Sequence, residues 1–317
     1  MAEPFERITV PDGDRAAWLD VRRKGVGGSD VAAIMGLSKY RSPYEVWAEK
    51  LGLVSSPDLS DNSAVQWGNI LEPVIADHYK SLHKSTAVKP GSCVMRSLKR
   101  PWAQASLDYE IDVPGLGKGI LEIKTAGSRS SSEWDEGVPV YYLTQVMHYM
   151  SVTGWQFADV AVLIGGQDYR EYRIMRDKDD IDSVEQAVDG FWHLVETREE
   201  PEILGVGREG SALIERYGVG EGDAECDIDP DDLESWITYN NLLKSTKATV
   251  AMYANRLKDR IGDGRSITCP SGKVVWVRSK SKKFDEKAFR ESHPDLYEEF
   301  CEERERDMGI RFYERKK

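Results

Sequence analysis

Residues 104–127 read QASLDYEIDVPGLGKGILEIKTAG and place charged side chains inside an otherwise apolar hairpin. Apolar and polar residues alternate before the turn PGLGKG, a period of two that is typical of a half-buried strand. The segment after the turn reads as a buried strand that carries Glu122 and Lys124. These two side chains share one face about 7 Å apart, while Leu121 and Ile123 point to the other face. The sequence therefore predicts a β-hairpin with acids on one face.

The partner strand of this hairpin brings Asp108 beside Glu122. Two carboxylates about 4 Å apart repel by roughly 4 kcal/mol at an effective dielectric of about 20, and a bound divalent cation reverses that cost. The two carboxylates, the carbonyl of Ile123 and water would suit Mg²⁺, which prefers oxygen ligands. Lys124 could then orient the attacking water or neutralise charge on phosphorus. The residues alone leave a simple salt bridge between Glu122 and Lys124 as the alternative.

Hydrophobic periodicity predicts further elements on both sides of this hairpin. Helices are expected at 12–24, 30–35, 64–83, 139–152 and 178–198, and a second hairpin is expected at 157–176. This alternation favours an α/β fold in which a mixed central β-sheet is flanked by helices.

The helix expected at 64–83 combines an apolar face with an internal proline. Its apolar face would comprise Trp67, Leu71, Val74, Ile75, His78 and Leu82. Pro73 has no N–H to donate to the carbonyl of Asn69, and it restricts the residue before it. A kink, or a helix start at Glu72, is therefore expected.

Composition along the chain divides it into three parts. Residues 1–200 form the predicted core, and the glycine-rich, acidic stretch 201–229 is the predicted linker. Residues 230–317 form a mainly helical C-terminal extension. It comprises a long helix at 230–261, a short hairpin at 267–278 and a helix broken at Pro294.

Charge and composition limit the classes of protein to consider. With 317 residues and 40% hydrophobic content the chain can bury a sizeable core. Its net charge of −12 argues against a protein that coats nucleic acid nonspecifically, so only local basic surfaces, at 84–100 and 273–290, could contact DNA. We find no apolar run of the ~20 residues that a membrane span needs and no signal peptide, so a cytoplasmic protein without membrane contact is expected.

The four cysteines are scattered. They are Cys93, Cys226, Cys269 and Cys301. No CxxC pair occurs, so neither zinc nor an iron–sulfur cluster is indicated and reduced thiols are expected.

The segment GVGGSD, residues 25–30, has the composition of an anion-binding turn. Its glycines let the backbone approach a ligand closely, and Ser29 is a suitable N-cap for the helix that follows. Free amides at a helix start bind anions, and Arg22 or Arg23 could add a bidentate phosphate contact. An ordinary capped helix with solvated arginines is the alternative.

Five motifs occur in a fixed order. They are RRKGVGGSD (22–30), WGNILEP (67–73), ASLD (105–108), GILEIK (119–124) and YYLTQVMHYM (141–150). Together they resemble the YqaJ-type viral recombinase family of the PD-(D/E)XK nuclease superfamily, to which lambda exonuclease and RecE-type exonucleases are related. The resemblance covers roughly residues 15–200 and implies a restriction-endonuclease-like core.

The resemblance also implies roles for single residues. Asp108 and Glu122 would be metal ligands and Lys124 the catalytic lysine. Glu72 matches a helix glutamate that such enzymes place beside the metals, and Gln145 matches a glutamine of the helix after the signature.

By the same resemblance, Arg22 and Ser29 would hold a terminal 5′-phosphate. Arg22 is favoured over Arg23 by its spacing to the serine.

The chain departs from the family pattern at three positions. Leu107 replaces a frequent proline, Tyr109 a common glycine, and Met147 a frequent second glutamine. Met147 puts in doubt any polar network that needs both glutamines. Glu110 and Asp112 share the face of Asp108, so either could replace it as the ligand.

The function implied is a Mg²⁺-dependent exonuclease, with Mn²⁺ able to substitute. It would digest one strand of linear double-stranded DNA from a 5′ end and leave a 3′ single strand for an annealing protein. The relatives imply a ring-shaped homo-oligomer and a phage or prophage protein in a bacterial host. Two alternatives are an endonuclease on the same core and an inactive protein whose residues 230–317 dock a recombination partner.

Overall fold

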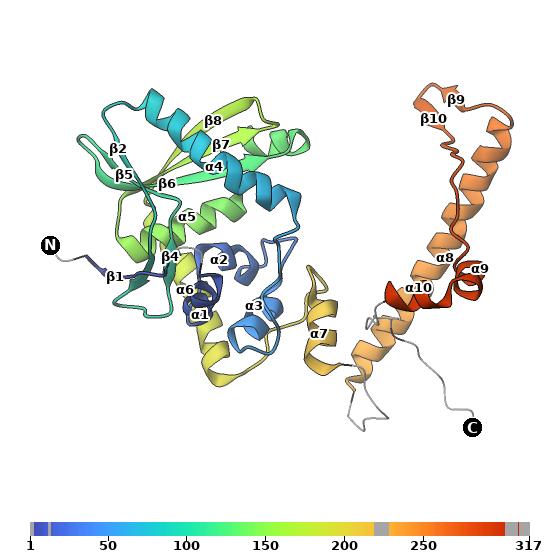
Figure 1. Ribbon diagram of the computed structural model, residues 1–317, viewed down its shortest axis with the longest axis horizontal. Helices are drawn as coiled ribbons and strands as arrows, with labels where there is room; N and C mark the ends of the chain where they lie inside the picture. Colours follow the sequence, from blue (N-terminus) through green and yellow to red (C-terminus); the bar gives the residue numbers. More distant parts are fainter. Residues whose placement is uncertain (1–2, 12–13, 219–227, 302–309, 311–317) are drawn as a thin grey trace. The chain divides into compact units, whose positions relative to one another are not determined.

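The computed structural model describes residues 3–11, 14–218, 228–301 and 310 of the chain. These residues fall into two compact units that divide after Gly218 (Figure 1).

A five-stranded mixed sheet forms the centre of the first unit. Its strands, in spatial order, are β2 (Ala87–Pro90), β5 (Tyr109–Val113), β6 (Gly117–Ala126), β7 (Phe157–Ile164) and β8 (Asp168–Met175). β6 and β7 run parallel, whereas the other neighbours are antiparallel. Both predicted hairpins are confirmed, as β5–β6 and β7–β8.

Helices cover both faces of this sheet, as the predicted fold requires (Figure 1). α4 (Ser63–Leu82) packs on Leu121 and Ile123 of β6. On the other face lie α5 (Val140–Thr153) and α6 (Lys178–Thr197), at the positions predicted. The predicted alternation of side chains along β6 is therefore confirmed: Leu121 and Ile123 contact α4, and Glu122 faces α5.

The strand predicted to run continuously through 104–113 is broken. β4 (Gln104–Ser106) joins β1 (Phe5–Ile8) and β3 (Val94–Ser97) in a second, three-stranded sheet, and β5 joins the main sheet. Between β4 and β5 the chain turns away from β6, so the N–H of Ile123 has no strand partner on that side. It donates instead to Asp108 Oδ2, at 2.8 Å. A side chain thus replaces the missing backbone partner and fixes Asp108 against β6.

α4 differs from prediction in two ways. It begins at Ser63, with Asn62 as N-cap, and continues through Pro73, so the alternative start at Glu72 is wrong. Its buried residues are Ile75, Ala76 and Tyr79, whereas Trp67, Val74 and Leu82 are 60%, 59% and 55% exposed. Apolar residues surround more of the helix than one sheet can cover.

Three short helices precede the sheet: α1 (Arg15–Arg23), α2 (Gly28–Ile34) and α3 (Pro43–Lys50). The N-cap of α2 is Gly27, so the prediction of Ser29 as N-cap is wrong. The side chain of Asp30 provides the hydrogen bond at the start of α2 instead, since its Oδ2 accepts from the N–H of Gly27 at 3.2 Å. The hydroxyl of Ser29 is left for other partners.

The stretch predicted as a linker contains a packed helix, α7 (Glu209–Tyr217). The N–H of Arg208 donates to Glu45 at 2.9 Å and Arg216 donates to the hydroxyl of Tyr44 at 2.9 Å. The first unit thus runs to Gly218, beyond the predicted end of the core at residue 200.

The second unit begins with a 32-residue helix, α8 (Pro230–Ile261). The hairpin of β9 (Ser266–Cys269) and β10 (Gly272–Val275) follows, then α9 (Glu286–Ser292) and α10 (Pro294–Glu299). The predicted break at Pro294 is confirmed. In the described part of the chain, no helix combines the length and apolarity that crossing a bilayer requires.

Cys93, Cys269 and Cys301 are free thiols, and Cys226 lies outside the described residues.

Candidate active site

Glu122, Lys124 and Gln145 form a hydrogen-bonded triangle between β6 and α5. Lys124 Nζ donates to Glu122 Oε1 at 2.7 Å and to Gln145 Oε1 at 3.2 Å. Gln145 Nε2 also donates to Glu122 Oε1, at 2.6 Å. Only 1% of Glu122 is exposed, and its Oε2 finds no hydrogen-bond partner among the described residues. Buried carboxylate oxygens are rarely left unpaired, which marks this atom as a position for a ligand.

Glu72, Asp108, Ile123 and Lys124 line one open pocket of about 260 Å³. Glu72 reaches it from α4, which lies across β6. Asp108 is held at its edge by the Ile123 N–H. The fold therefore brings a helix acid, a strand-junction acid and a lysine together from three separate segments.

The two other acids on the face of Asp108 do not reach this pocket. Glu110 pairs with Arg7, whose Nη2 lies 3.1 Å from Glu110 Oε2. Asp112 is exposed and lies opposite Lys118, towards the turn of the hairpin. Asp108 is thus the acid of this strand region that meets Lys124.

The electrostatics of the site favour neutral carboxyl groups in the absence of a cation. Burial, together with the charge of Asp108, raises the pKa of Glu72 to about 7. Burial also raises the pKa of Glu122, and repulsion by Asp108 adds to the effect. Burial alone would lower the pKa of Lys124, but Glu122 and Asp108 hold it above its usual value. The ionised carboxylates therefore help to retain the ammonium of Lys124, whereas burial works against their ionisation.

The residues of the pocket fit a hard divalent cation. The carboxylates of Asp108 and of the adjacent Glu122 and the carbonyl of Ile123 offer oxygen donors, the ligand type that Mg²⁺ and Mn²⁺ accept. The unpaired Oε2 of Glu122 and the carboxyl of Asp108 would be its protein ligands, with the Ile123 carbonyl as a third donor. In the part of the chain that the structure describes, no three His, Cys, Asp or Glu side chains gather in a metal-holding cluster. Water would therefore have to complete the coordination.

A second charged cluster surrounds Asp30 at the start of α2. Arg22 Nη2 donates to Ser29 Oγ and to Asp30 Oδ1, both at 2.9 Å. Arg41 and Lys50 also bond to Asp30, at 3.0 and 2.8 Å. Burial would raise the pKa of Asp30, but these three cations hold it well below its usual range.

The cluster leaves positive charge available to a ligand. Three cations meet Asp30, which is fully buried, while the side chain of Arg22 remains 20% exposed. Arg23 lies instead near Asp20, at 3.8 Å on the surface. An anion at this place would meet Arg22 and Ser29 together.

Gly28 connects the two clusters by close packing. A Cβ at this position would lie 2.4 Å from the ring of Tyr149 and 2.9 Å from Gln145 Cγ. Tyr149 in turn accepts a hydrogen bond from Gln145 Nε2 at 2.9 Å. The loop before α2 thus touches the residue that orients Glu122 and Lys124.

We expect Gly28→Ala to disturb the triangle through this contact. A methyl group at 2.4 Å from a ring forces Tyr149 or α2 to move, and overpacking of this kind costs about 1–3 kcal/mol. The measurement is the free energy of unfolding in urea together with the activity on DNA. Gly190→Ala, at a position with open space, is the matched control. A fully active and stable Gly28→Ala protein would contradict the contact.

Sequence reasoning missed three residues of the site: Asp30, Tyr142 and Tyr149. The Tyr142 ring lies 4.7 Å from Lys124 Nζ, a cation–π contact that supports its charge. Spacing on the helix gave a usable signal, since Tyr142, Gln145 and Tyr149 fall on one face at intervals of three and four. His148 directly precedes Tyr149 and does not lie on that face. It is a buried core histidine whose ring contacts the carbonyls of Val26 and Gln104.

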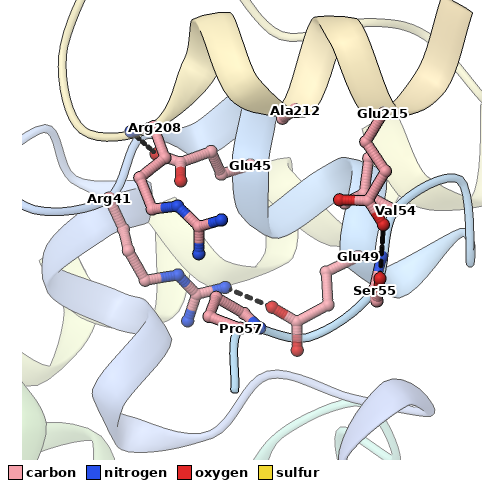
Figure 2. Close-up of a pocket in the computed structure, with 9 residues that line it drawn as sticks. All are labelled: Arg41, Glu45, Glu49, Val54, Ser55, Pro57, Arg208, Ala212 and Glu215. Atoms are coloured by element: carbon pink, nitrogen blue, oxygen red, sulfur yellow. Dashed lines mark hydrogen bonds and ion pairs between the residues drawn. The ribbon is translucent and has the colours of Figure 1, made fainter. Parts of the chain in front are cut away.

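A small cavity beside α3 belongs to the scaffold (Figure 2). It measures about 20 Å³, room for roughly one water molecule. Figure 2 shows Arg41 paired with Glu49 and the Arg208 main chain bonded to Glu45. The residues around it therefore hold α7 against α3 within the first unit.

Comparison with known proteins agrees with the motif pattern. Residues 17–156 match the YqaJ-like viral recombinase domain family. The uncharacterized protein YqaJ of Bacillus subtilis is 29% identical over 306 residues, or 94% of each chain. Protein D345L of African swine fever virus (strain Badajoz 1971 Vero-adapted) is 36% identical over 88 residues, which is 27% of this chain and 25% of the viral protein.

Two solved structures are also similar. An alkaline exonuclease from Laribacter hongkongensis matches with a TM-score of 0.49 and 23% identity, covering 58% of this chain and 93% of that one. A phage-related exonuclease from Haemophilus somnus matches with a TM-score of 0.41 and 16% identity, covering 55% and 94%. The family match and the relative that aligns over 94% of the chain confirm the resemblance read from the motifs: residues 17–156 are similar to the YqaJ-like viral recombinase domain.

Proposed function

We propose that this chain is a Mg²⁺-dependent DNA exonuclease that hydrolyses one strand of linear duplex from its 5′ end. The observation that carries the proposal is the pocket that collects Glu72, Asp108 and Lys124 in front of the Glu122–Gln145 pair. Phosphodiester hydrolysis needs an activated water and a group that stabilises charge on phosphorus, and this set of residues can provide both.

Each residue then has a separate task. A bound divalent ion would lower the pKa of a water molecule and polarise the scissile phosphate. Asp108 and Glu122 would hold that ion, and Lys124 would orient the water or neutralise the developing charge. Gln145 fixes the positions of Glu122 and Lys124 through its two hydrogen bonds.

The cluster around Asp30 supports an exonuclease over an endonuclease. Arg22 and Ser29 present a cation and a hydroxyl side by side, which suits a terminal phosphate. An enzyme that cuts within a strand has no need of a site for a 5′-phosphate. We further propose that the 3′ strand passes to a single-strand annealing protein and that the protein acts as a homo-oligomer.

The direct test uses three DNA substrates with Mg²⁺. We expect release of nucleotides from a linear duplex with 5′-phosphates, slower release from one with 5′-hydroxyls, and none from a covalently closed circle. Arg22→Ala should remove the preference for the phosphate, and Arg23→Ala should retain it. Cleavage of the circle would favour the endonuclease, and no cleavage of any substrate would favour the inactive binding protein.

Metal affinity should rise with pH. Below about pH 7, Glu72 is largely protonated, and the raised pKa of Glu122 acts in the same direction. A cation must displace these protons, so its affinity should increase up to about tenfold per pH unit for each proton released. Calorimetry in buffers of different ionisation enthalpy counts the protons. Glu72→Gln should release fewer, and affinity independent of pH would contradict the proposal.

A further inference from the structure

The second unit carries a basic surface that the proposed active site does not use. Residues 256–290 contain eleven Lys or Arg and four acids, in a chain whose net charge is −12. The eleven cations are Arg256, Lys258, Arg260, Arg265, Lys273, Arg278, Lys280, Lys282, Lys283, Lys287 and Arg290. Each is exposed, and none has a carboxylate within ion-pair distance in the described ranges. We call this set of exposed residues the 256–290 surface; of its members, Lys283, Lys287 and Arg290 line one common hollow.

The other basic run of the sequence behaves differently. In residues 84–100, Arg96 pairs with Glu6 at 2.6 Å and Arg100 pairs with Glu185 and Asp189. These arginines stabilise the first unit by internal ion pairs. Among the described residues, the cations of the 256–290 surface have no such ion pairs, and a polyanion is the partner that such a density of cations attracts.

Aromatic side chains lie among these cations. Phe284 is 65% exposed and, with Lys283, Lys287 and Arg290, lines an open hollow of about 640 Å³. Residues 276–285 form neither helix nor strand, and the Trp276 ring lies 4.2 Å from the guanidinium of Arg278. Cations beside an exposed ring, here that of Phe284, suit unpaired bases, which stack on the ring while the phosphates meet the charges.

The acids in the hollow are already engaged. Asp285 accepts from the N–H of Ala288 at 3.0 Å as the N-cap of α9. Glu286 accepts from the hydroxyl of Tyr297 at 2.7 Å. The three cations of the hollow outnumber these two acids by one.

From these observations we infer that the 256–290 surface binds single-stranded DNA, with Phe284 as a base-stacking platform. The inference rests on the proposed function for the choice of DNA as the polyanion. A strand of this kind is what the proposed reaction leaves behind.

The test measures binding of the full chain to a fluorescent oligonucleotide by anisotropy, in EDTA so that no hydrolysis occurs. Lys282→Ala/Lys283→Ala should weaken single-strand binding on the order of tenfold and reduce the slope of log K against log salt by about 1 per lysine. Lys244→Ala/Lys247→Ala removes the same charge from α8 outside the surface and should change neither quantity. Equal losses in both variants, or none in the first, would overturn the inference.

A third variant separates stacking from charge. Phe284→Ala should weaken single-strand binding by about fivefold or more and leave duplex binding unchanged. If duplex binding falls equally, or if an acidic protein such as polyglutamate competes as well as DNA does, the inference is wrong. Hydrolysis is assayed separately, so an inactive protein that binds single strands through these residues would refute the nuclease and leave this surface intact.

Discussion

Lys124→Ala is expected to lower the rate of DNA hydrolysis by roughly a hundred- to a thousandfold, the usual effect of removing one group that stabilises transition-state charge. Lys124 is the only cation hydrogen-bonded to Glu122 among the described residues. In the proposed mechanism, its loss removes the side-chain cation that would orient the water or balance charge on phosphorus, and leaves only the bound metal ion for these effects. The measurement is the single-turnover rate on 5′-phosphorylated linear duplex at saturating Mg²⁺.

Lys118→Ala provides a matched control on the same strand. Lys118 is exposed at the other end of β6 and pairs with Glu3 at 3.0 Å, outside the pocket. Its removal should leave the rate unchanged. An undiminished rate in Lys124→Ala, or an equal loss in both variants, would show that Lys124 has no part in the chemistry.

Asp30→Asn is expected to destabilise the first unit by about 3–5 kcal/mol, because a buried ion pair is broken from one side. Asp30 is fully buried and offsets Arg22, Arg41 and Lys50. Lys50 has only 1% of its side chain exposed, so its ammonium would remain in the core without a counter-charge. Urea unfolding followed by tryptophan fluorescence measures the change.

The pH dependence of this effect has a defined sign. The pKa of Asp30 is lower in the folded protein than in the unfolded chain, so its stabilisation is fully present above the unfolded value and is lost as the pH falls. The contribution of the Asp30 carboxylate to the stability of the wild type should therefore be fully present above about pH 5 and be lost at lower pH. Asp20→Asn, which loses only a surface contact to Arg23, should change stability by less than about 0.5 kcal/mol.

Local pattern was sufficient for much of the fold. Alternation in β5 and β6, and helical periodicity in α5 and α6, depend on neighbours in sequence, and the structure retains all four elements. The register of the first hairpin, with Tyr109 opposite Leu121, follows from its turn.

Other features depended on neighbours distant in sequence. The break between β4 and β5 occurs because β3 and β2 belong to different sheets, and nothing within 104–113 shows this. The face of α4 was misjudged because its apolar residues exceed the area that β6 can cover. Asp30 was overlooked because its partners Arg41 and Lys50 lie 11 and 20 residues away.

The sequence by itself determined the mixed α/β class, the hairpin with Glu122 and Lys124 on one face, and the family that residues 17–156 resemble. These conclusions follow from short-range periodicity and from the order of the motifs, which do not depend on how the rest of the chain folds. Only the tertiary structure decided that Asp108, rather than Glu110 or Asp112, meets Lys124, because that depends on where the chain leaves β6. It also decided that Gly28 joins the Asp30 cluster to Gln145, since contact between distant segments is a property of packing.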